Sequence, residues 1–206
     1  IKLSLWALAK EGGWIMIVLA IFSIIAVYIF TERFITINKS AKKDDNFMNM
    51  IRNYMIEGKI DDAKELCKQT DTSISRMIEK GLSRIGKPLN DIQTAIENVG
   101  NLEVGKLEKG VDLIGMISGA APMLGFLGTV TGMIRAFYDM SMAGNNIDIE
   151  LLSAGIYEAM VTTVGGLFVG ILAYIFYNVL VSKIDKVVNL LESKSIEFMD
   201  VLNEPA

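Results

Sequence analysis

The chain has 206 residues, of which 51% are hydrophobic, with a mean hydropathy of +0.40 and a formal net charge of −4. One cysteine and no histidine exclude an internal disulfide and argue against a zinc cluster or histidine-based proton chemistry. The acidic balance, without a lysine- or arginine-rich block, argues against nucleic acid as a partner. The sequence contains no nucleophile–base set, metal cluster or phosphate loop, so we predict neither an enzyme nor a bound cofactor or metal.

The first residues have an amphipathic pattern. Residues 1–13, "IKLSLWALAKEGG", place apolar side chains at Leu5, Trp6 and Ala9, and Gly12 and Gly13 end the pattern. This pattern predicts a short amphipathic helix at a membrane interface.

Three uncharged segments are long enough to cross a membrane: residues 14–31, 113–134 and 159–182. Three such segments in so short a chain favour a membrane protein over a large soluble core. The first resembles the apolar part of a signal peptide, but it is followed by "ERFITINKSAKK" rather than a small-residue cleavage site, which indicates a retained anchor. We predict transmembrane helices at residues 14–31, 113–137 and 156–182.

The distribution of basic residues predicts the orientation. Residues 32–112 carry 14 of the 20 lysines and arginines, and residues 139–158 carry none. By the positive-inside rule, the region 32–112 and the tail 183–206 face the cytoplasm. Residues 1–13 and the short loop 138–155 then face outward.

The region between the first two spans has helical patterns throughout. Residues 44–85 are interrupted at Gly58 and Lys59, and Gly86 and Pro88 mark a turn that starts the next helix. From Leu89 to Phe137 no strong breaker is present, which predicts one helix of about 50 residues. The third span continues as an apolar stripe into the tail. With no strand pattern of weight, we predict an all-α membrane protein with three transmembrane helices, two of them extended into the cytoplasm, and a cytoplasmic helical region.

The second span, which contains "AAPMLGFLGTVTGMIRAF", combines high hydropathy with residues that weaken helices in water. Its small residues share one face of a helical wheel, and "GGLFVG" in the third span repeats the pattern. In lipid, small residues allow helices to pack closely, and neighbouring helices compensate for a proline. One interpretation is a seam against the chain's own third span; the other adds a cavity with Thr129 as its hydroxyl. The predicted seam residues are Pro122, Gly125, Gly128, Gly132, Gly166 and Gly170.

Glu158 is the acidic residue that adjoins the third apolar segment. At depth in the membrane its protonated form would be favoured, which would permit proton exchange and mark an ion pathway. Alternatively, it lies at the outer interface and is solvated. Thr162 lies one turn along on the same face, whereas Thr163 lies about 140° around the helix from Glu158. Each threonine could instead bond only its own backbone carbonyl.

Two motifs carry a resemblance to a known family. "APMLGFLGTVTGMIRAF" followed by "GIYEAMVTTVGGLFVGILAYIFYN" closely resembles the MotA/TolQ/ExbB proton-channel family. "GKIDDAKELCKQT" and "NLEVGKLEKGVDLIGMISGAAP" look like the cytoplasmic region of that family. The resemblance covers nearly the whole chain. Three spans with a short outer loop resemble the ExbB/TolQ branch more than the four-span flagellar branch.

The resemblance implies an inner-membrane homopentamer around two copies of a single-span ExbD- or TolR-like partner with an intramembrane aspartate. It implies that proton motive force drives motion of partner against pentamer, and that work reaches the outer membrane, as through a TonB- or TolA-like protein. On the motifs, Thr129 and Thr163 match pore-lining threonines and Glu158 matches a buried glutamate. Because Thr163 and Glu158 point differently, we expect Thr163 to face the partner and Glu158 to face a neighbouring helix, such as the Thr129 side of the next subunit.

Two other functions remain open from the residues. A passive membrane scaffold would need the glycine seams only for assembly. A flagellar- or gliding-type stator subunit would need a peptidoglycan-binding partner. The sequence does not distinguish protons from sodium ions, nor iron or cobalamin uptake from envelope maintenance.

Overall fold

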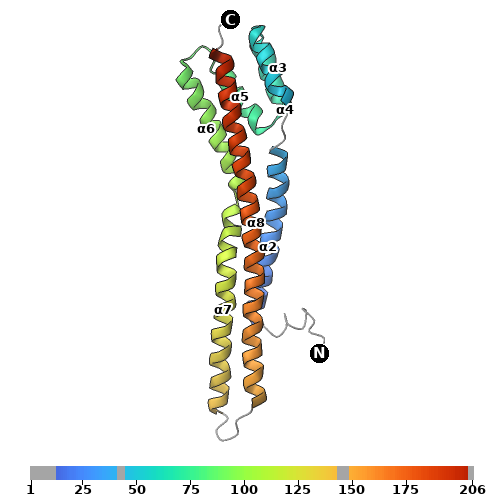
Figure 1. Cartoon of the computed structure of the whole chain (residues 1–206), viewed down its shortest axis with the longest axis vertical. Coiled ribbons are helices and arrows are strands. Elements are labelled where there is room, and N and C mark those ends of the chain that lie inside the picture. The colour runs from blue at the N-terminus through green and yellow to red at the C-terminus, as the bar shows by residue number, and fades with distance from the viewer. Residues whose placement is uncertain (1–12, 41–44, 143–148, 204–206) are drawn as a thin grey trace. The chain divides into compact units, whose positions relative to one another are not determined.

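The computed structural model describes residues 13–40, 45–142 and 149–203, which form helices joined by short turns (Figure 1). No strand is present among them, so the predicted all-α class is confirmed. The amphipathic helix predicted for residues 1–13 lies, except for Gly13, outside the described residues. The helices are α2 (Gly13–Ser40), α3 (Asp45–Ile56), α4 (Ile60–Thr70), α5 (Ser73–Leu82), α6 (Leu89–Glu108), α7 (Val111–Met142) and α8 (Ile149–Asn203).

The described residues contain three helical stretches long and apolar enough to cross a membrane. They include α2, α7 and the first part of α8, which hold the three segments expected to span it. Helix α7 continues to Met142 and α8 begins at Ile149, so helix covers most of the segment assigned to the loop 138–155. The membrane boundaries themselves remain predictions.

The chain divides into two compact units. Unit 1 comprises Ile1–Glu32 and Gly110–Val179, and unit 2 comprises Arg33–Lys109 and Leu180–Ala206. Helices α2 and α8 contribute residues to both units.

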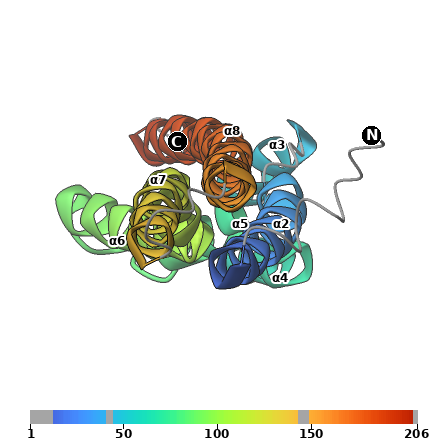
Figure 2. The same cartoon turned by 90° about the horizontal axis from the view of Figure 1, so that it is seen from below.

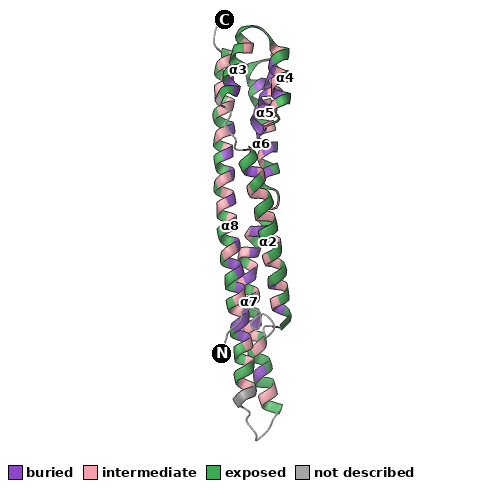
Figure 3. Cartoon of the chain, turned by 90° about the vertical axis from the view of Figure 1, so that its right-hand side faces the viewer, coloured by how far each residue is buried: buried purple, intermediate pink, exposed green. Residues whose placement is uncertain are grey.

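In unit 1, α7 and the first part of α8 run side by side, as the end-on view also shows (Figure 2). Helix α2 packs against α8: Phe30 stacks on Phe176 of α8 with ring centroids 4.1 Å apart. A Cβ atom on Gly110, which precedes α7, would lie 3.6 Å from Ile29. Much of the surface of these helices is exposed in the isolated chain (Figure 3), including Met123, Phe126 and Phe168.

Unit 2 is a helical bundle with a core of large apolar side chains. Met77 and Ile78 of α5, Ile96 of α6 and Phe198 of α8 are each at most 2% exposed. Gly81 makes room for this packing, because a Cβ atom there would lie 2.6 Å from the Phe198 ring and 2.8 Å from Ile96. Lys183 of α8 donates a hydrogen bond to Asn38 and lies over the ring of Phe34, which fixes the end of α2 within the same unit.

The structure contains two helix breaks that the sequence did not predict. The continuous helix predicted from Leu89 to Phe137 is wrong: α6 ends at Glu108 and α7 begins at Val111, because Gly110 adopts φ +85°. A second break at Asp71, with φ 41°, separates α4 from α5. Thr72 then caps α5 through a reciprocal pair of hydrogen bonds with Ser75. The capping pattern is present in the sequence as "TSIS".

Candidate functional site

The α7–α8 contact in unit 1 is a close approach of two backbones. A Cβ atom on Gly125 would lie 2.8 Å from the carbonyl oxygen of Thr162, and one on Gly166 would lie 2.6 Å from the carbonyl oxygen of Ala121. Such distances leave no room for a side chain, because the atoms met are backbone and cannot turn away. Glycine at these two positions lets the helices approach closely, as expected for helices that associate in lipid.

The remaining small residues extend this contact in both directions along the helices. A Cβ atom on Gly170 would lie 2.5 Å from the ring of Pro122, so a glycine on α8 accommodates the proline on α7. Toward the other end, a Cβ atom on Gly132 would lie 3.0 Å from the side chain of Ala159. Gly128 faces Thr162. The structure therefore places all six predicted seam residues between α7 and α8 of the same chain.

Three threonine hydroxyls meet in the middle of this contact. Thr129 of α7 and Thr162 and Thr163 of α8 lie around two backbone carbonyls, those of Gly125 and Ala159. The oxygen of Gly125 is 3.3 Å from the Thr129 hydroxyl, 3.3 Å from that of Thr162 and 3.2 Å from that of Thr163. The oxygen of Ala159 is 3.1 Å from the Thr129 hydroxyl and 2.7 Å from that of Thr162. The hydroxyls of Thr129 and Thr163 also hydrogen-bond each other.

This threonine cluster has more contacts than protons. Each hydroxyl has one hydrogen to donate, so three protons serve six contacts. The hydroxyls can therefore satisfy the two carbonyls in several alternative arrangements. Thr162 is 2% exposed, and its hydroxyl contacts a carbonyl of its own helix and one of α7, while Thr163 donates across to α7. Neither threonine is therefore restricted to its own backbone carbonyl. A network of this kind can reorient its protons within a low-dielectric setting without leaving a carbonyl unpaired.

Glu158 is partly buried and is directed toward the first residue of α2. Its Oε1 lies 3.1 Å from where a Cβ atom on Gly13 would be, and Gly13 adopts φ +61°. The structure thus brings the three threonines together and places the carboxylate beside the start of α2. Thr163, expected to face a central partner, contacts Thr129 within the chain and remains partly exposed.

A second polar cluster, which no sequence pattern predicted, lies in unit 2. Glu103 of α6 is 3% exposed and accepts hydrogen bonds from Ser73 at 3.0 Å, Arg76 at 2.5 Å and Lys106 at 2.6 Å. Burial alone would raise the pKa of Glu103, but the three donors outweigh it and hold the pKa at about 2. Arg76 also pairs with Asp71 at 2.6 Å. This cluster joins the start of α5 to α6. The spacing of these residues gave no local signal, because 27 residues separate Arg76 from Glu103.

No group of three or more His, Cys, Asp or Glu side chains suited to a metal occurs among the described residues. The oxygen atoms of the threonine cluster belong to hydroxyls and backbone carbonyls. In the structure these oxygens form hydrogen bonds within and between the two helices.

The model of the MotA/TolQ/ExbB proton channel family matches residues 69–193, which include the whole threonine cluster and Glu158. The chain belongs to this family. With three apolar helices, it is a multi-pass integral membrane protein. The family is one of proton channels rather than a known enzyme family.

Individual relatives agree with the predicted ExbB/TolQ branch. The chain is 30% identical to the putative biopolymer transport protein ExbB-like 1 of Synechocystis over 84% of its own length and 68% of that protein's. It is 26% identical to the putative ExbB homolog of Methanothermobacter thermautotrophicus, over 89% of this chain and 65% of the relative. It is 32% identical to the Tol-Pal system protein TolQ of Haemophilus influenzae over 48% of this chain and 42% of the relative. The chain spans about two thirds of the length of the first two.

Proposed function

We propose that the chain is a subunit of an inner-membrane, proton-driven motor of the ExbB/TolQ kind, with its N-terminus in the periplasm and its C-terminus in the cytoplasm. Five copies would surround the membrane helices of a single-span ExbD- or TolR-like partner that carries an intramembrane aspartate. Proton motive force would drive motion between partner and pentamer. The work would pass to the outer membrane through a TonB- or TolA-like protein, as in import of a nutrient.

The threonine cluster is the observation that supports this proposal most directly. It lies within the part of the chain that matches a proton channel family, between two helices that can cross a membrane. Thr129 and Thr163 are partly exposed, so their hydroxyls can also meet an acidic side chain from a partner helix. One elementary charge crossing the membrane releases about 2.3 kcal/mol per 100 mV, so a few protons suffice to rearrange helix contacts.

The first experiment is the native mass of the detergent-extracted complex, with and without a co-expressed single-span membrane protein encoded beside it. A pentamer that gains two copies of that protein supports the proposal. A monomer or dimer whose mass ignores the partner favours a passive scaffold. A partner with a peptidoglycan-binding domain and cytoplasmic rotor contacts favours a stator.

The second experiment measures proton flux into proteoliposomes that contain this complex. We expect Glu158→Gln, Thr129→Val and Thr163→Val each to reduce the flux by at least about tenfold. Thr131→Val is the matched control, because Thr131 is exposed and its hydroxyl donates to carbonyls of its own helix, those of Leu127 and Gly128. Unchanged flux in all variants would reject the assignment of these residues. Replacing the proton gradient with a sodium gradient tests which ion is carried.

A further inference from the structure

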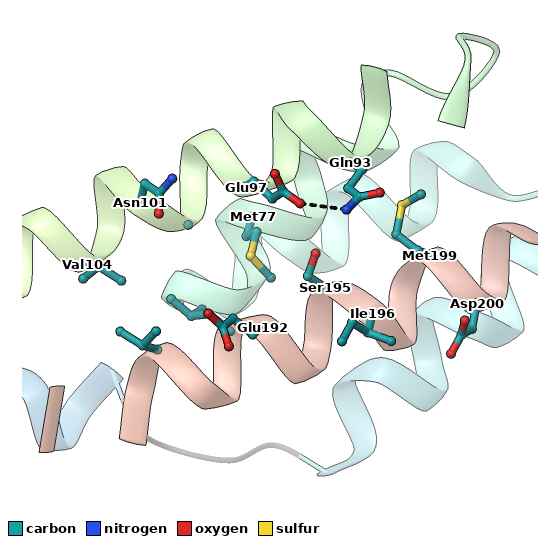
Figure 4. Close-up of a pocket in the computed structure, with 13 residues that line it drawn as sticks. Met77, Gln93, Glu97, Asn101, Val104, Glu192, Ser195, Ile196, Met199 and Asp200 are labelled. Carbon is teal, nitrogen blue, oxygen red and sulfur yellow. Dashed lines mark hydrogen bonds between the residues drawn. The ribbon is translucent and has the colours of Figure 1, made fainter. Parts of the chain in front are cut away.

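Unit 2 contains a groove that the proposed function does not explain. It has a volume of about 550 Å³ and lies between α6 and the C-terminal part of α8, with α5 beneath it (Figure 4). Its floor is apolar: Met77 and Leu191 are buried there, and Val188 and Met199 are partly exposed. An apolar floor of this kind, with two flexible methionines, suits an amphipathic helix laid into it.

The rim of the groove is acidic. Glu97 of α6 and Glu192 and Asp200 of α8 line it, and all three are exposed. Glu97 accepts a hydrogen bond from Gln93 at 2.8 Å. No lysine or arginine lines the groove, and none of the three carboxylates makes an ion pair within the described part of the chain. This local excess of negative charge contrasts with Glu103 nearby on α6, which has two cationic partners.

In sequence, residues that line the groove lie only a few positions from the segments predicted to cross the membrane. Val188 follows Ser182, the end of the third uncharged segment, by six residues, and Val104 precedes Leu113, the start of the second, by nine. A segment that leaves the membrane beside these helices can therefore reach it. On the cytoplasmic side such flanking segments are rich in lysine and arginine.

We propose that this groove binds a cationic amphipathic helix supplied by the cytoplasmic flank of the single-span partner. Apolar side chains of that helix occupy the floor, and its lysines or arginines pair with Glu97, Glu192 and Asp200. This inference rests on the proposed function, because it takes the partner from there. It adds a second contact, outside the membrane, that holds the flank of the partner to α6 and α8.

The test uses the full-length complex co-expressed in cells, with a photoreactive amino acid in place of Ser195, which lines the groove. Ser193 is the matched control, since it lies on the same helix, is exposed and does not line the groove. We expect the residue at 195, but not at 193, to cross-link to the basic flank of the partner, with the site located by mass spectrometry.

Charge variants separate docking from mere proximity. We expect Glu97→Gln, Glu192→Gln and Asp200→Asn, combined, to reduce the cross-link by at least about fivefold. The control combines Asp62→Asn, Glu108→Gln and Asp185→Asn, which removes the same charge from exposed positions outside the groove. It should leave the cross-link unchanged.

The outcomes distinguish this inference from the proposed function. If the native mass still shows the partner but the residue at 195 cross-links no more than that at 193, the groove proposal is overturned while the proposed function stands. A cross-link to a second copy of this chain, or one indifferent to the groove charges, overturns it likewise. A complex without the partner overturns both.

Discussion

The two units of this chain differ in the residues that form their central helix contacts. In unit 1, glycines, Ala121 and Thr162 lie inside the α7–α8 contact, while large side chains such as Phe126, at 66% exposed, point outward. In unit 2, Phe198, Met77 and similar side chains fill the interior, and charged residues cover the outside.

The difference follows from the solvent that each unit meets. In water, burial of apolar area stabilises a fold by about 25 cal/mol per Å², so the large side chains of unit 2 turn inward. In lipid no such gain exists, and helices associate through close backbone packing and hydrogen bonds. Polar groups differ in the same sense: unit 1 pairs neutral hydroxyls with carbonyls, whereas unit 2 buries a charge with several donors.

The largest loss of stability is expected at Gly166, where the α7–α8 contact of unit 1 has no room for a side chain. Gly166→Leu would place a side chain against the backbone of α7. Its Cβ atom would already lie 2.6 Å from the carbonyl oxygen of Ala121. We expect a loss of about 3 kcal/mol, at the upper end of what overpacking costs, because the atoms met are backbone. Gly119→Leu is the control, because nothing lies within 4 Å of its Cβ position. Thermal unfolding in lipid nanodiscs measures both, and equal melting temperatures would contradict the backbone seam.

The second largest loss of stability is expected at Glu103, the buried carboxylate of unit 2. Glu103→Gln removes the carboxylate on which Ser73, Arg76 and Lys106 converge. Since the pKa of Glu103 is lowered from 4.5 to about 2, we expect a loss of about 2–3 kcal/mol at neutral pH. Hydrogen exchange of the α5 and α6 amides measures this loss.

The pH dependence of the same exchange gives an independent check. Because the pKa is lower in the folded state, the unfolded state binds more protons as pH falls. The contribution of Glu103 is therefore complete above about pH 4.5 and is lost between about pH 4.5 and 2. The Glu103→Gln variant should lack this component. An identical acid profile in variant and wild type would contradict the charge pairing.

The last effect is on chemical reactivity rather than on stability and concerns Cys67 of α4, which is 1% exposed. Burial, with a smaller contribution from Glu79, raises the pKa of its thiol to about 12. We expect maleimide to label it at least about 100-fold more slowly than the thiol of a Ser193→Cys variant in a Cys67→Ser background. Glu103→Gln should increase the rate at which maleimide labels Cys67, because loss of the charge cluster makes local unfolding of unit 2 more frequent. Labelling of Cys67 at the rate of the exposed thiol would contradict this packing.

Much of the candidate site was accessible from the sequence. The small face of "PMLGFLGTVTG" and the repeat in "GGLFVG" indicated where α7 and α8 would meet, because a wheel of one helix needs only local spacing. Thr129, Thr162 and Thr163 were named, but their partners were not. Thr129 and Thr163 are 34 residues apart, and their contact depends on the register and the rotation with which α8 packs on α7.

The sequence by itself determined the helical class and the three apolar stretches, since each follows from composition and spacing within short windows. The family rested on the resemblance of two membrane motifs, which the family model confirms. Tertiary structure alone decided that Glu158 turns toward Gly13, that Glu103 is buried among donors and that an acidic groove opens over Met77. It also decided the break at Gly110. On a helical wheel this glycine does not differ from the other small residues of the segment. The physical reason is that hydropathy is a sum over neighbours in sequence, whereas contacts between helices depend on their register, and no local pattern encodes that register.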